Sequence, residues 1–115
     1  MDVISVASVQ RFMADKMQKV GLFETDRMFC DVYCFEPGQS QAPHAHDGAD
    51  KIYFVLSGQG LFRVGDQEHR LSPQQATLAP SGSDHGVIND SDERLVVLVF
   101  MAPHPGRKSA PVHQH

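Results

Sequence analysis

Two histidines separated by one alanine, His44 and His46, are the residues of this chain best suited to chemistry. On a β-strand, residues two apart point to the same face, and their Cα atoms lie about 6.6 Å apart. Two imidazole nitrogens so arranged can bind one metal ion at ~2.0–2.1 Å. A third histidine, His85, follows the turn sequence "PSGSD" and begins another predicted strand. If the strands close into a barrel, His85 supplies a third nitrogen to the same ion.

Three neutral imidazoles form a donor set for a divalent transition metal, and Fe, Mn, Ni, Cu and Zn all accept it. Coordination positions left open by the protein would serve water, dioxygen or a substrate oxygen. Each histidine taken alone also fits a hydrogen-bonded residue of a barrel interior. The metal prediction therefore depends on His44, His46 and His85 together.

The elements that must position these histidines are short β-strands. Turn-forming glycine, proline, asparagine and aspartate residues separate seven segments rich in strand formers. These segments span residues 27–35, 51–57, 60–64, 67–71, 76–79, 85–89 and 94–101. No helical pattern lies between them, so the sequence predicts an all-β antiparallel sandwich or barrel rather than βαβ units.

One helix is predicted before the strands, over residues 8–21. Its apolar residues recur at helical spacing, and Gly21 is a suitable stop. Two cysteines, Cys30 and Cys34, lie four apart in the first strand, with Cα atoms about 13 Å apart, too far for a disulfide. We expect both to be buried thiols on one face of that strand.

The residues named so far belong to two longer patterns. The first consists of Gly38, His44, His46, Lys51 and Gly58, and the second of Pro80, Gly82, His85 and Asn89. With these spacings, they resemble the two signature motifs of the cupin superfamily, whose members are small jelly-roll β-barrels with a metal in the barrel mouth.

Eight of the ten fixed motif positions match, over a resemblance that spans roughly residues 28–103. The departures are Lys51, where cupins place a glutamate, and Gln74, where they place a glycine. The resemblance implies a cupin jelly-roll barrel but no single reaction, because this fold hosts dioxygenases, isomerases, decarboxylases, storage proteins and sugar-binding regulators.

Lys51 makes the metal prediction conditional, because a protonated amine has no lone pair and repels a divalent cation. Three outcomes stay open. Lys51 turns toward Asp47 or Asp50, it stays in the cavity to receive a substrate carboxylate or enolate, or it fills a metal-free pocket. A Schiff-base role would need a strongly lowered pKa and is not expected. Tyr53, on the same strand face, is a second candidate substrate contact.

The composition is that of one globular domain, with 115 residues, 41% of them hydrophobic and 21% charged. A net charge of −4 argues against nucleic acid or an anionic membrane as the partner. No apolar run reaches the ~20 residues of a membrane span, and the N-terminus lacks the basic region of a signal peptide. We therefore expect a cytoplasmic protein.

The predicted organisation is an N-terminal extension with an amphipathic helix over residues 1–26, a cupin barrel over 27–103 and a C-terminal tail over 104–115 with solvated histidines. The strands at 51–57 and 94–101 are apolar on both faces, which favours a homodimer.

The predicted function is that of a small metal-dependent cupin, a dioxygenase or isomerase that acts on a small anionic or carbonyl compound. His44, His46 and His85 would hold the metal, and Lys51 and Tyr53 would contact the substrate. The alternative is a non-catalytic or metal-free cupin that binds a small molecule with Lys51 in its pocket.

Overall fold

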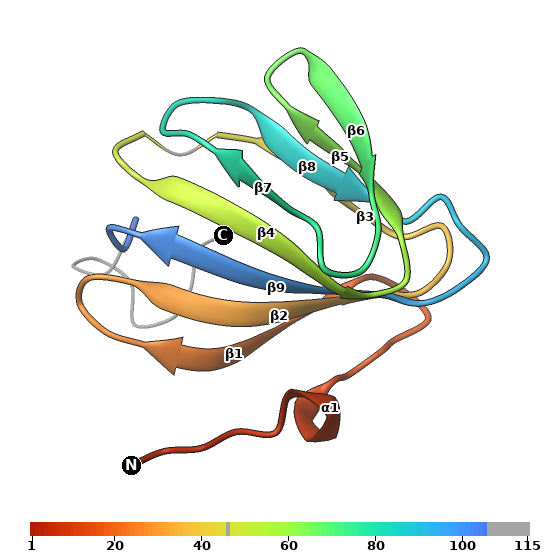
Figure 1. The fold of residues 1–115 in the computed structure, drawn as a ribbon, viewed down its shortest axis with the longest axis horizontal. Coiled ribbons are helices and arrows are strands. Elements are labelled where there is room, and N and C mark those ends of the chain that lie inside the picture. Colours follow the sequence, from red (N-terminus) through yellow and green to blue (C-terminus); the bar gives the residue numbers. More distant parts are fainter. Residues whose placement is uncertain (46, 106–115) are drawn as a thin grey trace.

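The computed structural model describes residues 1–45 and 47–105, which fold into two facing β-sheets (Figure 1). This part of the chain contains a short helix, α1 (Val6–Val9), and nine strands. The strands are β1 (Gln18–Glu24), β2 (Phe29–Phe35), β3 (Ser40–His44), β4 (Asp50–Ser57), β5 (Gly60–Val64), β6 (Gln67–Leu71), β7 (Ala76–Ala79), β8 (His85–Ile88) and β9 (Leu95–Ala102).

All strand pairs are antiparallel. A five-stranded sheet has the order β1-β2-β9-β4-β7, and a four-stranded sheet has the order β3-β8-β5-β6. The predicted all-β jelly-roll barrel with a short N-terminal helix is thus confirmed. No helix of the described residues is long and apolar enough to cross a membrane.

The core lies between the two sheets because alternate residues of each strand point inward. Burial of each large apolar side chain there contributes about 1.5–3 kcal/mol. The largest inward-facing apolar residues are Phe29, Tyr33, Phe35, Tyr53, Phe62, Leu71, Leu95 and Met101. The same alternation turns Lys51 inward between Asp50 and Ile52, so a lysine lies among apolar core residues.

The helix predicted over residues 8–21 is wrong in its bounds, because residues 18–24 form strand β1. β1 pairs with β2, and the outward-facing Val20 and Leu22 pack near Val32. This pairing satisfies the backbone groups along one edge of β2, which outweighs a weak helical preference. β1 therefore forms part of the sheet although its residues fall in the predicted N-terminal extension. The predicted division into extension, barrel and tail stays a prediction.

Two other expectations concern the cysteines of β2 and the predicted C-terminal tail. Cys30 and Cys34 are free, buried thiols on β2, as predicted. His104 is not solvated as predicted, because its side chain is only 1% exposed, pairs with Glu24 and contacts the Phe29 ring edge-on. The remaining predicted tail residues from 106 onward lie outside the described residues.

Two turns show why the motif has glycines at fixed places. Gly58 has φ +77°, and a Cβ added there would lie 2.1 Å from the Arg94 carbonyl oxygen, so no larger residue fits. Gln74, at the other glycine position, also has a positive φ of 74°. The Gln75 N–H donates to the Ser72 carbonyl at 3.1 Å, which closes a turn whose third residue favours glycine. Gln74 therefore holds a strained backbone conformation.

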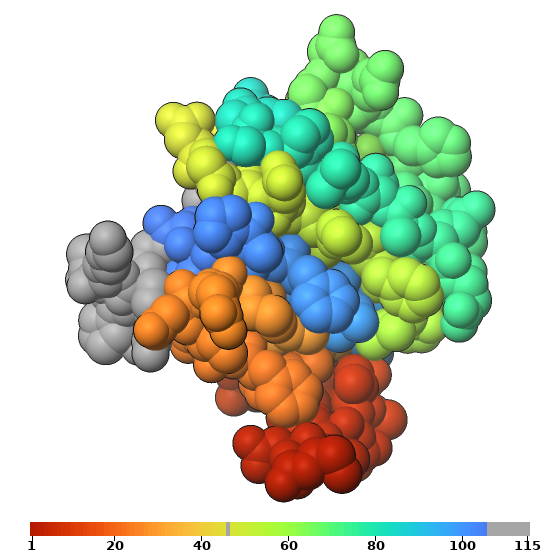
Figure 2. All heavy atoms as spheres, turned by 60° about the vertical axis from the view of Figure 1, so that its left-hand side comes forward, coloured from red at the N-terminus to blue at the C-terminus, as the bar shows by residue number. Residues whose placement is uncertain are grey.

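The outer face of the five-stranded sheet is apolar. Figure 2 looks onto this face and shows β2, β9, β4 and β7 side by side, with the N-terminal segment at its lower end. Val6 and Phe12 of that segment cover part of the face. Ile52, Leu78 and Phe100 stay 40–52% exposed.

Candidate functional site

His44 and His85 meet inside the barrel because β3 and β8 are neighbouring strands and pair these two residues directly. Their ring centroids lie 4.6 Å apart, with 56° between the ring planes. The Nδ1 atom of His44 lies 3.1 Å from the Ala42 carbonyl oxygen, and that of His85 lies 3.1 Å from the Ser83 carbonyl oxygen. The Nε2 atoms of both rings are buried. An Nδ1–H that donates to a carbonyl leaves the lone pair on Nε2, as metal-binding histidines commonly do.

This pair fits a shared metal ion. Two imidazoles that bind one ion at ~2.0–2.1 Å, with ~90–110° between the bonds, have ring centroids roughly 4.5–5.3 Å apart. Burial lowers the pKa of His44; the bond to the Ala42 carbonyl opposes this shift, and the Lys51 amine adds to it. The net shift is downward, so this ring is neutral at pH 7, as a ligand must be.

The third predicted ligand, His46, lies outside the described residues. Within residues 1–45 and 47–105, no three His, Cys, Asp or Glu side chains gather into a metal-binding group. The structure thus brings together two of the three predicted ligands.

Lys51 is fully buried and acts electrostatically on the His44 ring. Its Nζ lies 5.1 Å from the centroid of the Tyr33 ring and 5.2 Å from that of Tyr53. It has no hydrogen-bond partner among the described residues. The predicted alternative in which Lys51 turns toward Asp47 or Asp50 is therefore not the conformation observed.

Burial lowers the pKa of Lys51 to about 7, because a charged amine loses its hydration inside the barrel. The Lys19 amine lowers this pKa further, and the Asp31 carboxylate opposes the change. The lysine therefore changes charge near neutral pH. A lowered pKa is also the condition that a Schiff-base lysine would need, so this chemistry, which the sequence did not favour, is compatible with the position.

Two tyrosines complete the inner wall. The Tyr53 hydroxyl donates to Gln41 Oε1 at 3.0 Å, and its ring lies 6.1 Å from that of His85. Burial raises the pKa of Tyr53. Burial also raises the pKa of Tyr33, reinforced by Tyr53 and Asp31, while the adjacent Gln41 amide opposes the rise. Both phenols therefore stay protonated and serve as neutral hydrogen-bonding groups.

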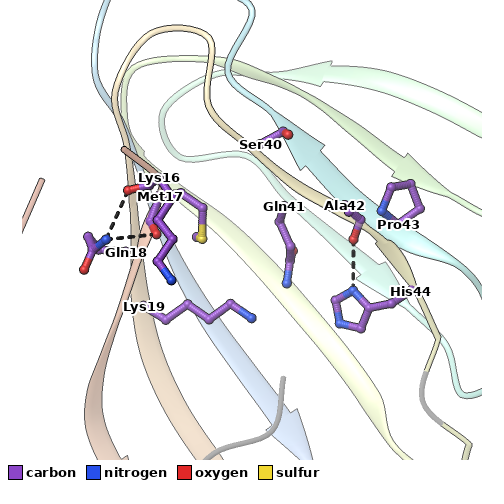
Figure 3. A pocket seen from close by; sticks show the side chains of 9 residues that line it. All are labelled: Lys16, Met17, Gln18, Lys19, Ser40, Gln41, Ala42, Pro43 and His44. Carbon is purple, nitrogen blue, oxygen red and sulfur yellow. Dashed lines mark hydrogen bonds between the residues drawn. The ribbon is translucent and has the colours of Figure 1, made fainter. Parts of the chain in front are cut away.

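A cavity of about 640 Å³ opens between β1 and β3, the edge strands of the two sheets. Figure 3 shows side chains from both strands pointing into it. Its lining consists of Lys16, Met17, Gln18, Lys19, Ser40, Gln41, Ala42, Pro43 and His44. His44 thus joins the buried histidine pair to a space large enough for a small metabolite.

Four polar residues of the site were not among those predicted: Lys19, Asp31, Tyr33 and Gln41. Asp31 and Tyr33 alternate with the two cysteines of β2, so the predicted strand places them on the face opposite the cysteines but does not show that this face points inward. Lys19 was assigned to the end of a helix, and Gln41 lies in β3, a strand that was not delimited. No sequence signal places these last two side chains together, because only the closed barrel does so.

Histidines on adjacent strands inside a two-sheet barrel, with a cavity at one edge, define a β-barrel protein with a polar interior site. Residues 31–101 match the family model for the cupin domain, and the chain belongs to this family. This confirms the resemblance found in its two motifs.

Several known proteins resemble this chain in sequence or in structure. The TT1209 protein of Thermus thermophilus has a crystal structure that superimposes with a TM-score of 0.87, at 40% identity over 90% of this chain and 98% of that one. An oxalate-binding protein of Thermotoga maritima is 26% identical over 77% of this chain and 75% of its own. A double-stranded β-helix protein of Klebsiella pneumoniae, 24% identical, matches with a TM-score of 0.84 over 90% of each chain and shows the fold alone.

Proposed function

We propose that this chain is a small cupin that holds a divalent transition metal on His44, His46 and His85 and acts as a dioxygenase or isomerase on a small anionic or carbonyl compound. The observation that carries the proposal is the His44–His85 pair, with ring centroids 4.6 Å apart and both Nδ1 atoms beside backbone carbonyls. With Nδ1 donating to a carbonyl, each of the two rings keeps a lone pair on Nε2 inside the barrel, where one metal ion can accept both. A histidine with a purely structural role would need only its hydrogen bond to the backbone.

A bound divalent metal would supply a Lewis acid for a carbonyl or carboxylate oxygen. The chain's own residues supply the rest. Lys51, with a pKa of about 7, can hold or release a proton at Nζ near neutral pH. Tyr53, fixed by its bond to Gln41, offers a phenol that stays protonated beside His85. The surrounding apolar residues exclude water and strengthen these polar interactions.

The class of compound follows from the charges in the barrel and from the relatives. The positive charge available at Lys51 suits an anion, because no hydrogen-bond acceptor among the described residues contacts its Nζ. The relative from Thermotoga maritima is named an oxalate-binding protein, which supports a small anion as the ligand.

One observation favours a second function, in which the barrel binds a small molecule without a metal. Lys51 is fully buried and close enough to His44 to lower the pKa of that ring, so its protonated form would repel a divalent ion held there. A buried cation without a hydrogen-bonded acceptor can instead be neutralised by an anionic ligand, with no turnover required.

We also propose that two copies of the chain associate through the outer face of the five-stranded sheet. Ile52, Leu78 and Phe100 form an apolar surface there that the N-terminal segment leaves open. A cytoplasmic location remains our prediction, and the free thiols Cys30 and Cys34 suit such a reducing compartment.

The metal content of the purified protein tests the first proposal against the second. Protein prepared without added metal should carry a transition metal near one ion per chain, and His46→Ala and His85→Ala should lose it. His69→Ala removes an exposed histidine of β6 and should keep it. Lys51→Glu should tighten metal binding, because it replaces a repelling charge with a ligand.

A wild-type protein that holds no metal, and whose melting temperature does not rise with Ni, Mn, Fe or Zn salts, would favour the metal-free function. Equal metal content in His85→Ala and wild type would contradict the proposed ligand set.

A further inference from the structure

Lys19 and Gln41 lie on opposite walls of the cavity, on β1 and β3. Figure 3 shows the Lys19 ammonium and the nitrogen end of Gln41 pointing toward the same space beside the His44 ring. The Lys19 Nζ lies 5.3 Å from the centroid of the Tyr33 ring, a cation–π contact that orients the lysine toward the barrel interior.

Gln41 is only 6% exposed, and one half of its amide is already used. Its Oε1 accepts the Tyr53 hydroxyl at 3.0 Å, which fixes the amide plane. Its Nε2 is buried and makes no hydrogen bond of ordinary distance and angle among the described residues, although the amide lies near enough to the Tyr33 hydroxyl to lower the pKa of that phenol. A buried N–H donor without an acceptor is destabilising by about 1–3 kcal/mol, so it is expected to serve a ligand or a bound water.

The charges around this point also favour an anion. Burial lowers the pKa of both Lys19 and Lys51, the Lys19 amine lowers that of Lys51 further, and the Asp31 carboxylate raises both. Two potential cations thus face one carboxylate. Lys51 does not line the cavity, whereas Lys19 and Gln41 do. An anion in the cavity therefore lies against the more buried Lys19 and Gln41, with the exposed Lys16 at the rim, rather than against Lys51.

We infer that Lys19 and Gln41 form a carboxylate-binding subsite at the barrel mouth, which holds one carboxylate of a small substrate beside His44. This inference depends on the class of substrate in the proposed function, a small anion. It does not depend on the proposed metal site. The Lys19 ammonium provides charge and the Gln41 amide an N–H donor. A second oxygen of the same substrate would then extend toward His44. The subsite favours small mono- and dicarboxylates over neutral carbonyl compounds.

Calorimetric titration with malonate, and with malonamide as its uncharged analogue, tests the subsite on metal-stripped protein from which the chelator has been dialysed. Wild type should bind malonate and bind malonamide at least ~10-fold more weakly. Lys19→Gln should weaken malonate binding by ~10-fold or more. Gln41→Glu keeps the acceptor for Tyr53 but turns a negative charge toward the ligand, so it should weaken binding at least as much.

Arg27→Gln is the matched control, because it removes one exposed positive charge in the turn between β1 and β2. It should change malonate binding by less than ~2-fold, since salt screens distant surface charges. Circular dichroism and the melting temperature establish that each variant folds.

The inference is overturned if wild type does not bind malonate, if malonamide binds equally well, or if Arg27→Gln weakens binding as much as Lys19→Gln. The metal content of wild type, measured separately, distinguishes the two proposals. Malonate binding by a protein that carries no metal as purified would contradict the metal site alone. A protein that carries metal as purified but does not bind malonate after the metal is removed would contradict the subsite alone.

Discussion

Replacing Lys51 by methionine should stabilise the protein, and by an amount that depends on pH. Lys51 is fully buried, and its pKa in the folded protein is about 7, against 10.5 for the unperturbed group. Methionine is similar in length, flexible and uncharged, so it can fill the same space. The substitution removes a buried ionisable amine and leaves the surrounding tyrosines in place.

The size of the effect follows from the two pKa values of Lys51. A shift from 10.5 to about 7 means that burial of the protonated amine is unfavourable by roughly 4–5 kcal/mol. Below pH 7 the amine is protonated in both states, and wild type bears this whole penalty. Between about pH 7 and 10.5 the unfolded state binds more protons, so wild-type stability rises with pH. The advantage of Lys51→Met should fall from roughly 4–5 kcal/mol at pH 6 to roughly 2 kcal/mol at pH 9.

Other charged or ionisable groups also act on the region around Lys51. Lys19 on β1, Asp31 on β2 and His44 on β3 all act on this region of the barrel. They are present in both proteins, so their direct contributions largely cancel in the difference between variant and wild type.

Equilibrium unfolding in urea at pH 6, 7, 8 and 9, on metal-free protein, measures this difference. Lys16→Met, which removes an exposed lysine at the cavity rim, is the matched control and should show a difference that does not change with pH. A Lys51→Met advantage that is constant from pH 6 to pH 9 would show that the amine is not buried as a penalised charge, and the reasoning would fail.

Three further predictions concern the scaffold. Gln74→Gly should raise the free energy of unfolding by ~0.5–1 kcal/mol, because glycine adopts the positive φ of 74° without strain; an unchanged or lower melting temperature would argue against a strained turn. Gly58→Ala should lower the free energy of unfolding by ~3 kcal/mol or more, since its Cβ would lie 2.1 Å from the Arg94 carbonyl oxygen; a denaturation midpoint near wild type would refute that close approach. Phe100→Lys should convert a dimer into monomers in sedimentation experiments, because it places a charge on the open apolar face; an unaltered dimer would locate the interface elsewhere.

Much of the fold was predictable because its determinants are local. Residues 60–64, 67–71 and 76–79 form strands with the predicted bounds, since turn residues stand directly between them. The helix over 8–21 was mispredicted because its apolar residues suit either a helix or a strand there. Pairing with β2, the next strand along the chain, decides the outcome.

Those residues of the site whose positions follow from motif spacing or from the alternation of a strand could be predicted from the sequence. His44 and His85 lie on adjacent strands, and Lys51 points inward beside Tyr53, as the alternation along β4 requires. Lys19 and Gln41 were missed because they come from two edge strands that do not pair with each other, so only the closed barrel brings them to one cavity.

The central claim, that imidazoles inside the barrel share one metal ion, is tested most directly by anomalous X-ray diffraction from crystals of the native protein. Data collected above and below the absorption edge of the metal identified by elemental analysis should give one anomalous peak per chain, within ~2.0–2.3 Å of the Nε2 atoms of His44, His46 and His85. Crystals with no anomalous peak between the rings of His44 and His85, or with a peak elsewhere on the chain, would contradict the claim.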